Sequence, residues 1–151
     1  MADKIQTGDA APDFTLPASD GSEFKLSEHG GEWVVLYFYP KDNTPGCTKE
    51  ACTFRDNHDD FVGAGARVVG VSGDSLDSHA KFVRQHDLPF VLLSDRGDAL
   101  RRQYGVAKTM GVLPGRVTYV IDPEGIVRHV FNSQMRASQH IDEALATIRG
   151  A

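Results

Sequence analysis

The sequence predicts an α/β fold in which helices flank a central, mixed β-sheet. Residues 34–39 and 68–72 are short, uncharged runs rich in β-branched or aromatic side chains, which is typical of strands buried on both faces. The stretch between them has helical periodicity, so the two runs are expected to be parallel strands of a β-α-β unit. Residues 116–121 and 126–131 flank a turn with proline and glycine, which indicates an antiparallel hairpin. A parallel pair and a hairpin together make the predicted sheet mixed.

Length and composition favour one domain. With 151 residues, 40% of them hydrophobic, the chain is long enough for one domain over residues 1–151 and too short for two ordinary ones. It has neither a basic start followed by an apolar stretch nor about 18 consecutive apolar residues, so neither export nor a membrane span is expected. A net charge of −5 without a Lys/Arg cluster argues against a nucleic-acid surface. Two cysteines in such a chain fit the reducing cytoplasm.

The N-terminal part carries two short strand candidates, residues 13–16 and 23–26. The four residues 19–22 between them, Ser-Asp-Gly-Ser, have hairpin-turn chemistry. We expect this pair to be an N-terminal β extension that covers an edge of the sheet.

A helix is expected over residues 76–86, after the second buried strand. Ser75 precedes it and can cap its first N–H groups. Its apolar face is expected to consist of Leu76, Ala80 and Val83.

The remaining elements complete the order of a thioredoxin-like fold. A short buried strand, a small helix, a loop and a last helix are expected over residues 90–93, 98–104, 106–115 and 138–149. With the hairpin, the order is β-α-β, then α, then β-β-α, with an inserted strand and helix, which is the arrangement of that fold.

The residues that carry chemistry follow the strand at 34–39. Pro40 ends the strand, and Thr44-Pro45 is a favourable helix start, with a hydroxyl to cap free N–H groups and proline at the first helical position. Cys47 then falls in the first turn. Unpaired backbone N–H groups and the positive end of the helix dipole favour a thiolate there, and the thiolate is the nucleophilic form.

Cys52 lies five residues further along the same helix. Ideal helix geometry separates the two Cα atoms by ~8.7 Å, whereas a disulfide tolerates only about 7 Å. Pairing of the two cysteines would therefore require the first turns of the helix to unwind, which would make the pair a redox switch. The alternative is two unrelated small hydrophobic residues in a reduced protein.

The histidines do not suggest a metal site. His58 follows Cys52 by six residues, but a Cys/Cys/His zinc site lacks a fourth ligand at a recognised spacing. His79 and His86 are interpreted as solvated. The sequence therefore predicts neither a metal nor a cofactor.

Residues 37–52 resemble the active-site segment of the peroxiredoxins, most closely that of the bacterioferritin comigratory protein or Q-type subfamily. The family motif Pro-x-x-x-Thr-x-x-Cys is met by Pro40, Thr44 and Cys47. The aromatic strand before the motif and the second cysteine five places after Cys47 strengthen the match. The resemblance extends over essentially the whole chain.

The resemblance implies a peroxidase active in antioxidant defence. Cys47 would be oxidised by hydrogen peroxide or an organic hydroperoxide to a sulfenic acid, and Cys52 would resolve it as an intramolecular disulfide. Thioredoxin or a similar dithiol protein would reduce the disulfide, and the protein would be a monomer.

Arg116 and Glu50 each have two interpretations. An arginine that starts a strand is most often a solvated or edge-protecting charge, and a glutamate within a helix is most often on a wet face. The resemblance instead implies that Arg116 stabilises the developing charge and the thiolate, and that Glu50 holds Arg116. By the same resemblance, Thr44 would orient the peroxide and Pro40 would shield the pocket from water.

Two other classes of function stay open. A thioredoxin-type disulfide reductase uses two cysteines separated by two residues, and this chain has four between them. A redox-responsive binding or chaperone module is compatible with a helix that exposes apolar surface when it unwinds.

Overall fold

The computed structural model describes residues 5–106, 115–133 and 136–150. Most of the loop predicted for residues 106–115 therefore lies outside the described residues. The prediction of one domain over residues 1–151 stays a prediction.

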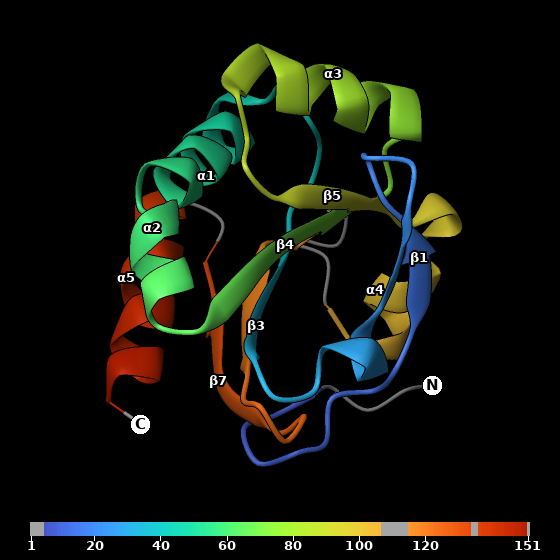
Figure 1. Cartoon of the computed structure of the whole chain (residues 1–151). Helices are drawn as coiled ribbons and strands as arrows, with labels where there is room; N and C mark the ends of the chain where they lie inside the picture. The colour runs from blue at the N-terminus through green and yellow to red at the C-terminus, as the bar shows by residue number, and fades with distance from the viewer. Residues whose placement is uncertain (1–4, 107–114, 134–135, 151) are drawn as a thin grey trace.

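A five-stranded mixed sheet forms the centre of the structure, in the order β5-β4-β3-β6-β7 (Figure 1). Its first three members are parallel, and β6 and β7 run antiparallel to their neighbours. The strands are β3 (Trp33–Phe38), β4 (Ala66–Ser72), β5 (Val91–Ser94), β6 (Val117–Ile121) and β7 (Val127–Asn132). The predicted mixed sheet is confirmed.

The sheet separates two apolar clusters, because side chains of β3 alternate between its faces. Val35 and Tyr37 point into the cluster formed with helices α1 (Pro45–Asp56), α2 (His58–Gly63) and α5 (Ala137–Arg149). Figure 1 shows these three helices together along one side of the sheet. The second cluster, on the opposite face, contains Val34, Leu36, Phe38, Leu100 and Tyr104. Leu100 belongs to the short helix α4 (Ala99–Gln103).

The N-terminal extension lies at the edge strand β5, as predicted. Strands β1 (Thr15–Pro17) and β2 (Glu23–Lys25) are antiparallel, and Ala18 forms a β-bridge with Leu93. This pairing satisfies backbone groups that an open edge would expose.

The helices differ from the predictions in three respects. The helical stretch after Cys47 is not one helix, because it is interrupted at Asn57 between α1 and α2. The helix α3 (Leu76–His86) has the predicted bounds and the Ser75 cap, but Leu76 is exposed. Its buried residues are Phe82 and His79, and His79 was expected to be solvated. A buried histidine with polar partners cannot be recognised from an apolar pattern.

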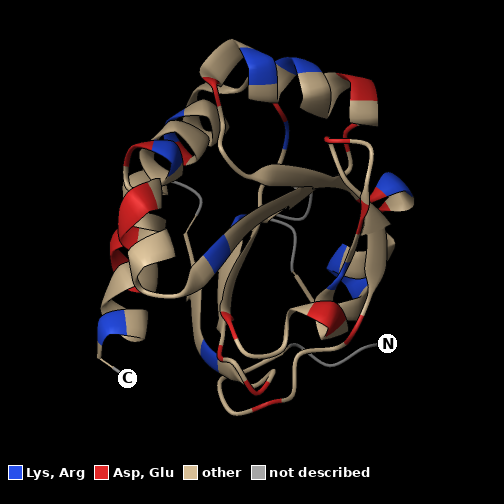
Figure 2. Cartoon of the chain, viewed as in Figure 1, with Lys and Arg blue, Asp and Glu red and all other residues tan. Residues whose placement is uncertain are grey.

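Residues of both charge signs occur in the helices and in the loops. Figure 2 shows Lys and Arg interspersed with Asp and Glu along the helices and loops. No helix of the described residues is long and apolar enough to cross a membrane.

Gly70 of β4 provides a test of the packing at the sheet centre. A Cβ at this position would lie 2.8 Å from both Leu92 Cδ2 and Tyr37 Cζ. We expect Gly70→Ala to lower the free energy of unfolding by about 1–3 kcal/mol, measured by urea denaturation. Gly63→Ala is the matched control, because no atom lies within 4 Å of its added Cβ. Equal stability of the two variants would contradict this account of the packing.

Candidate active site

The loop of residues 40–44 connects β3 to α1 and carries two residues of the motif. Pro40 is half-buried and comes two residues after the last residue of β3, and Thr44 precedes the first residue of α1. The Thr44 hydroxyl donates to the carbonyl oxygen of Lys41 at 3.0 Å. It makes no cap to the helix, so the prediction that this hydroxyl caps α1 is wrong. The hydroxyl instead bonds to a residue that precedes it in the chain, and this bond closes the loop.

Cys47 lies in the first turn of α1 and is 1% exposed. It shares the buried face of the helix with Ala51 and Phe54. The first helical hydrogen bond runs from the Thr48 N–H to the Thr44 carbonyl at 2.8 Å. The N–H groups of residues 46 and 47 precede that bond, at the positive end of the helix dipole, where an anionic sulfur is favoured.

The strand β6 brings Arg116 to the same place. The antiparallel register pairs Val117, the first residue of β6, with Phe38, the last of β3. Arg116 therefore lies where β3 passes into the loop. It is 3% exposed, and its Nη2 donates to Cys47 Sγ at 3.3 Å. The interpretation of Arg116 as a solvated or edge-protecting charge is wrong.

Gly46 allows this approach. A Cβ at position 46 would lie 3.0 Å from Arg116 Nη2. Any side chain there would press on the guanidinium and move it relative to Cys47. The sequence did not indicate this role for Gly46.

Glu50 binds the same guanidinium. Its side chain is fully buried, and Oε1 accepts from Arg116 Nη1 at 2.6 Å, so its interpretation as an acid on a wet face is wrong. Burial raises the pKa of Glu50 to about 8, and Arg116 offsets only part of that rise. Burial would lower the pKa of Arg116, but Glu50 and Cys47 outweigh it and raise the pKa, so the guanidinium stays charged. Two acceptors thus share one cation.

His140 of α5 completes the cluster. Its Nε2 lies 2.8 Å from the Ser133 carbonyl oxygen and its Nδ1 lies 2.7 Å from Thr118 Oγ1. Because a carbonyl only accepts, Nε2 carries a proton, and Nδ1 accepts from the Thr118 hydroxyl. Burial lowers the pKa of His140 to about 4, so the ring is neutral at pH 7. Its Nδ1 is 3.6 Å from Glu50 Oε2.

Cys52 is half-buried on the same continuous helix, and both cysteines are free. The two cysteines are five positions apart in the helix, with four residues between them, so α1 holds the two sulfurs apart. Among the described residues, the cluster with metal-binding spacing is Asp42, Asp74 and His79. It includes neither cysteine.

Arg101 is a buried neighbour of the site that the sequence did not indicate. It is 5% exposed and donates from Nη2 to the Tyr39 carbonyl at 2.8 Å and from Nη1 to the Gly115 carbonyl at 2.6 Å. These bonds connect the end of β3 to the residue before Arg116. One arginine in a short helix has no distinguishing sequence pattern.

Comparison with known proteins assigns the family. The AhpC/TSA family matches residues 7–130. The chain belongs to this family. Peroxiredoxin Q, chloroplastic, from Populus jackii is 50% identical over 147 residues, which cover 97% of this chain and 69% of that protein. The Arabidopsis thaliana protein of the same name is 48% identical over 149 residues, which cover 98% of this chain and 69% of that protein.

Solved structures agree with this assignment. Peroxidoxin BcpB from Mycobacterium tuberculosis has a TM-score of 0.89 and 41% identity, with 97% of each chain covered. Xanthomonas campestris peroxiredoxin Q has a TM-score of 0.85 and 36% identity, with 91% of this chain and 90% of that chain covered. The thioredoxin-like fold and the resemblance to Q-type peroxiredoxins are confirmed. The chain is a peroxiredoxin, and its activity is that of a peroxidase, an oxidoreductase.

The neutral state of His140 makes the stability of this peroxiredoxin depend on pH. The pKa of His140 is 6.5 in the unfolded chain and about 4 in the folded chain. Between these pH values the unfolded chain binds a proton on His140 and the folded chain does not. Stability therefore falls as pH falls through that range, by about 3 kcal/mol from this group. Between pH 7 and pH 4, we expect the free energy of unfolding of His140→Gln to fall by about 3 kcal/mol less than that of the parent protein. Urea denaturation at the two pH values measures this difference. An identical loss in both proteins would show that His140 is not held neutral.

Proposed function

We propose that this chain reduces hydrogen peroxide and organic hydroperoxides through Cys47. The observation that carries the proposal is the contact between the Arg116 guanidinium and Cys47 Sγ at the start of a helix. A helix N-terminus and a buried cation on one sulfur both favour its ionised, nucleophilic form. One of the solved relatives, from Xanthomonas campestris, is described by its alkyl peroxide reduction activity.

In the first step, the thiolate attacks the outer oxygen of the hydroperoxide. The O–O bond breaks, sulfur loses two electrons and becomes a sulfenic acid, and the departing alkoxide or hydroxide takes up a proton. Arg116 and the N–H groups of residues 46 and 47 stand where donors can stabilise the developing charge. Thr44 orients the peroxide, and Pro40 shields the pocket from water.

In the second step, the Cys52 thiol condenses with the sulfenic acid. A disulfide forms and water leaves, after the first turns of α1 have unwound to bring the sulfurs together. A dithiol protein such as thioredoxin then reduces the disulfide and is itself oxidised. Cys52 is the second cysteine of a chain that contains two, which supports its assignment as the resolving residue.

The partners and the compartment follow from this chemistry. Reduction by a dithiol protein requires a reducing compartment, such as the cytoplasm, although the plant relatives are named chloroplastic. The dispersed charges and the net charge of −5 support a protein without a nucleic-acid partner. We infer that it acts as a monomer.

The two cysteines should separate the two steps. We expect Cys47→Ser to abolish peroxide consumption in the presence of a thioredoxin system. Cys52→Ser should still form one sulfenic acid per chain, trapped and counted by mass spectrometry, but should lose turnover. Loss of the first step in both variants would refute these roles. Disulfide cleavage without peroxide would indicate a reductase, and inactivity in both assays would indicate a binding module.

Arg116→Ala should slow the oxidation of Cys47 by about 100-fold, because donors to the developing charge are removed. The measurement is the second-order rate constant of the parent and variant proteins with hydrogen peroxide by stopped flow. Arg102→Ala is the control, because Arg102 is exposed and bonds only locally, to the Gly97 carbonyl. An unchanged rate in Arg116→Ala would remove this residue from the mechanism.

A further inference from the structure

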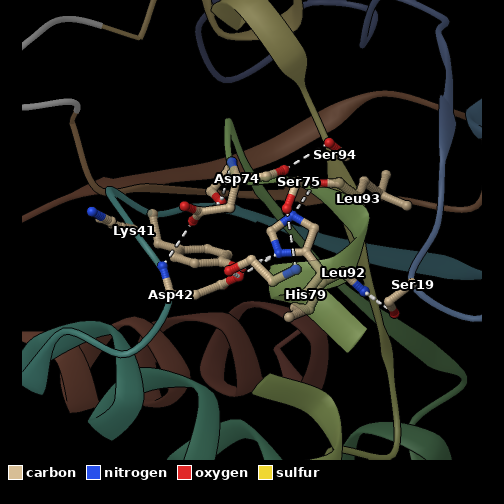
Figure 3. Close-up of polar contacts among 12 residues, drawn as sticks. Ser19, Lys41, Asp42, Asp74, Ser75, His79, Leu92, Leu93 and Ser94 are labelled. Carbon is tan, nitrogen blue, oxygen red and sulfur yellow. Dashed lines mark hydrogen bonds and ion pairs between the residues drawn. The ribbon is translucent and has the colours of Figure 1, made fainter. Parts of the chain in front are cut away.

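The loop that carries the motif is held in place at Asp42. Asp42 is 5% exposed and accepts hydrogen bonds on both carboxylate oxygens. Oδ1 accepts from the Tyr39 hydroxyl at 2.5 Å, and Oδ2 accepts from the Ser78 hydroxyl at 2.8 Å. The backbone N–H of Asp42 donates to Asp74 Oδ2 at 2.8 Å. Figure 3 shows Asp42, Asp74 and His79 converging from the loop, from the segment before α3 and from α3.

His79 is the centre of this arrangement. Its Nδ1 lies 2.7 Å from Asp42 Oδ2, and its Nε2 lies 2.9 Å from the carbonyl oxygen of Leu93 in β5. The ring is fully buried, between the loop on one side and β5 on the other (Figure 3). His79 therefore joins three parts of the chain that are distant in sequence.

The geometry defines the protons on this ring. The Leu93 carbonyl can only accept, so Nε2 carries a proton. Asp42 is ionised, because burial raises its pKa but the bonds from His79 and Tyr39 outweigh burial and lower it. A carboxylate also only accepts, so Nδ1 carries a proton as well. His79 is thus placed to donate from both ring nitrogens, to the Asp42 carboxylate and to the Leu93 carbonyl.

A metal ion does not fit this site, although Asp42, Asp74 and His79 have suitable spacing. A histidine binds a metal through an unprotonated nitrogen, and both nitrogens of His79 face acceptors. Asp74 Oδ2 already accepts from the Ser72 hydroxyl and from the Asp42 N–H. The donors and acceptors of the cluster satisfy one another.

The hydrogen bonds that fasten the loop end at Asp42, three positions before Pro45, the first residue of α1. Asn43, between Asp42 and Thr44, has a positive φ of 62°, a conformation that non-glycine residues seldom adopt. The chain therefore turns sharply there. Residues up to Asp42 are held by β5 and α3, whereas Thr44 and the first turn of α1 have no such bond to α3.

We propose that Asp42 and His79 are positioning residues, which hold residues 40–42 fixed while the chain beyond Asn43 unwinds. This inference rests on the proposed peroxidase mechanism. In the folded site the pair keeps Pro40 and Thr44 in place around Cys47 for the attack on peroxide. In the resolving step the same pair keeps residues 40–42 in place while the following segment unwinds. The segment can therefore refold from a fixed end once the disulfide has been reduced.

A kinetic separation of the two steps tests the proposal. In His79→Leu we expect the oxidation of Cys47 by hydrogen peroxide to slow by about tenfold or more, since small misplacements of reacting groups have effects of that size. The formation of the Cys47–Cys52 bond should be as fast as in the parent protein or faster. Rapid quenching followed by mass spectrometry measures both rates in one experiment.

His86→Leu is the matched control on the same helix, because the His86 ring contacts Phe82 and makes no bond to the loop. It should change neither rate. An oxidation rate within about twofold of the parent protein in His79→Leu, or an equal slowing of both steps, would overturn the proposal. Failure of the parent protein to react with peroxide would instead refute the proposed function.

Milder variants keep the test open if His79→Leu does not fold. Ser78→Ala removes one donor to Asp42 from a partly exposed residue and should slow oxidation by a few fold. In a double-mutant cycle, Asp42→Asn with His79→Leu should be no slower than the slower single variant. Additive effects would show that the two residues do not act as a pair.

The protonation of His79 can be observed directly. Long-range ¹H–¹⁵N correlation spectra at pH 7 should show both ring nitrogens protonated. The groups that face the ring are the Asp42 carboxylate, the Tyr39 hydroxyl and Asp74. A neutral His79 at pH 7 would overturn the assigned pair.

Discussion

The site depends on one guanidinium shared by two acceptors on the same helix. Cys47 and Glu50 are three residues apart, so α1 presents both on one side, and Arg116 reaches each with a different nitrogen. In a buried site an uncompensated charge is strongly unfavourable. In the proposed mechanism, a neutral Glu50, which its raised pKa favours, leaves Arg116 to pair with the Cys47 thiolate. The proposed mechanism therefore relies on a buried counter-charge, the Arg116 guanidinium, to stabilise the reactive anion.

Sheet topology explains why so many polar groups gather there. The parallel strands β3, β4 and β5 end at one edge of the sheet, and the loops that follow them lie next to one another. The antiparallel β6 starts at that edge because its direction is reversed. Asp42, Asp74 and Leu93 therefore come from three strand ends, and Arg116 comes from a strand start. The residues of the site are distant in sequence, but they all lie at the end of the sheet where the parallel strands finish.

The sequence predicted the strands and helices, because these depend on local patterns of residues. It could not predict the pairs of buried polar side chains, because their members are distant in sequence. The strand at 34–39 and the helix at 76–86 have strong local signals, and the structure contains both. His79 was interpreted as solvated because a histidine among polar neighbours carries no signal that a carboxylate lies 37 residues away. Glu50 and Arg116 could be paired from family resemblance but not from spacing, because 66 residues separate them.

The proposed mechanism requires the first turn of α1 to be closed in one step and open in the next. The side-chain cap that was predicted at Thr44, and that the structure lacks, would affect both steps. Attack on peroxide needs Cys47 held against Arg116, whereas formation of the disulfide needs the same turn to open. A side-chain cap on this helix would stabilise the closed turn by about 1 kcal/mol. Thr44 instead bonds back to Lys41, and the fixed contacts end at Asp42. Rigidity is thereby placed before the turn that must open, so that opening leaves the contact between Asp42 and His79 intact.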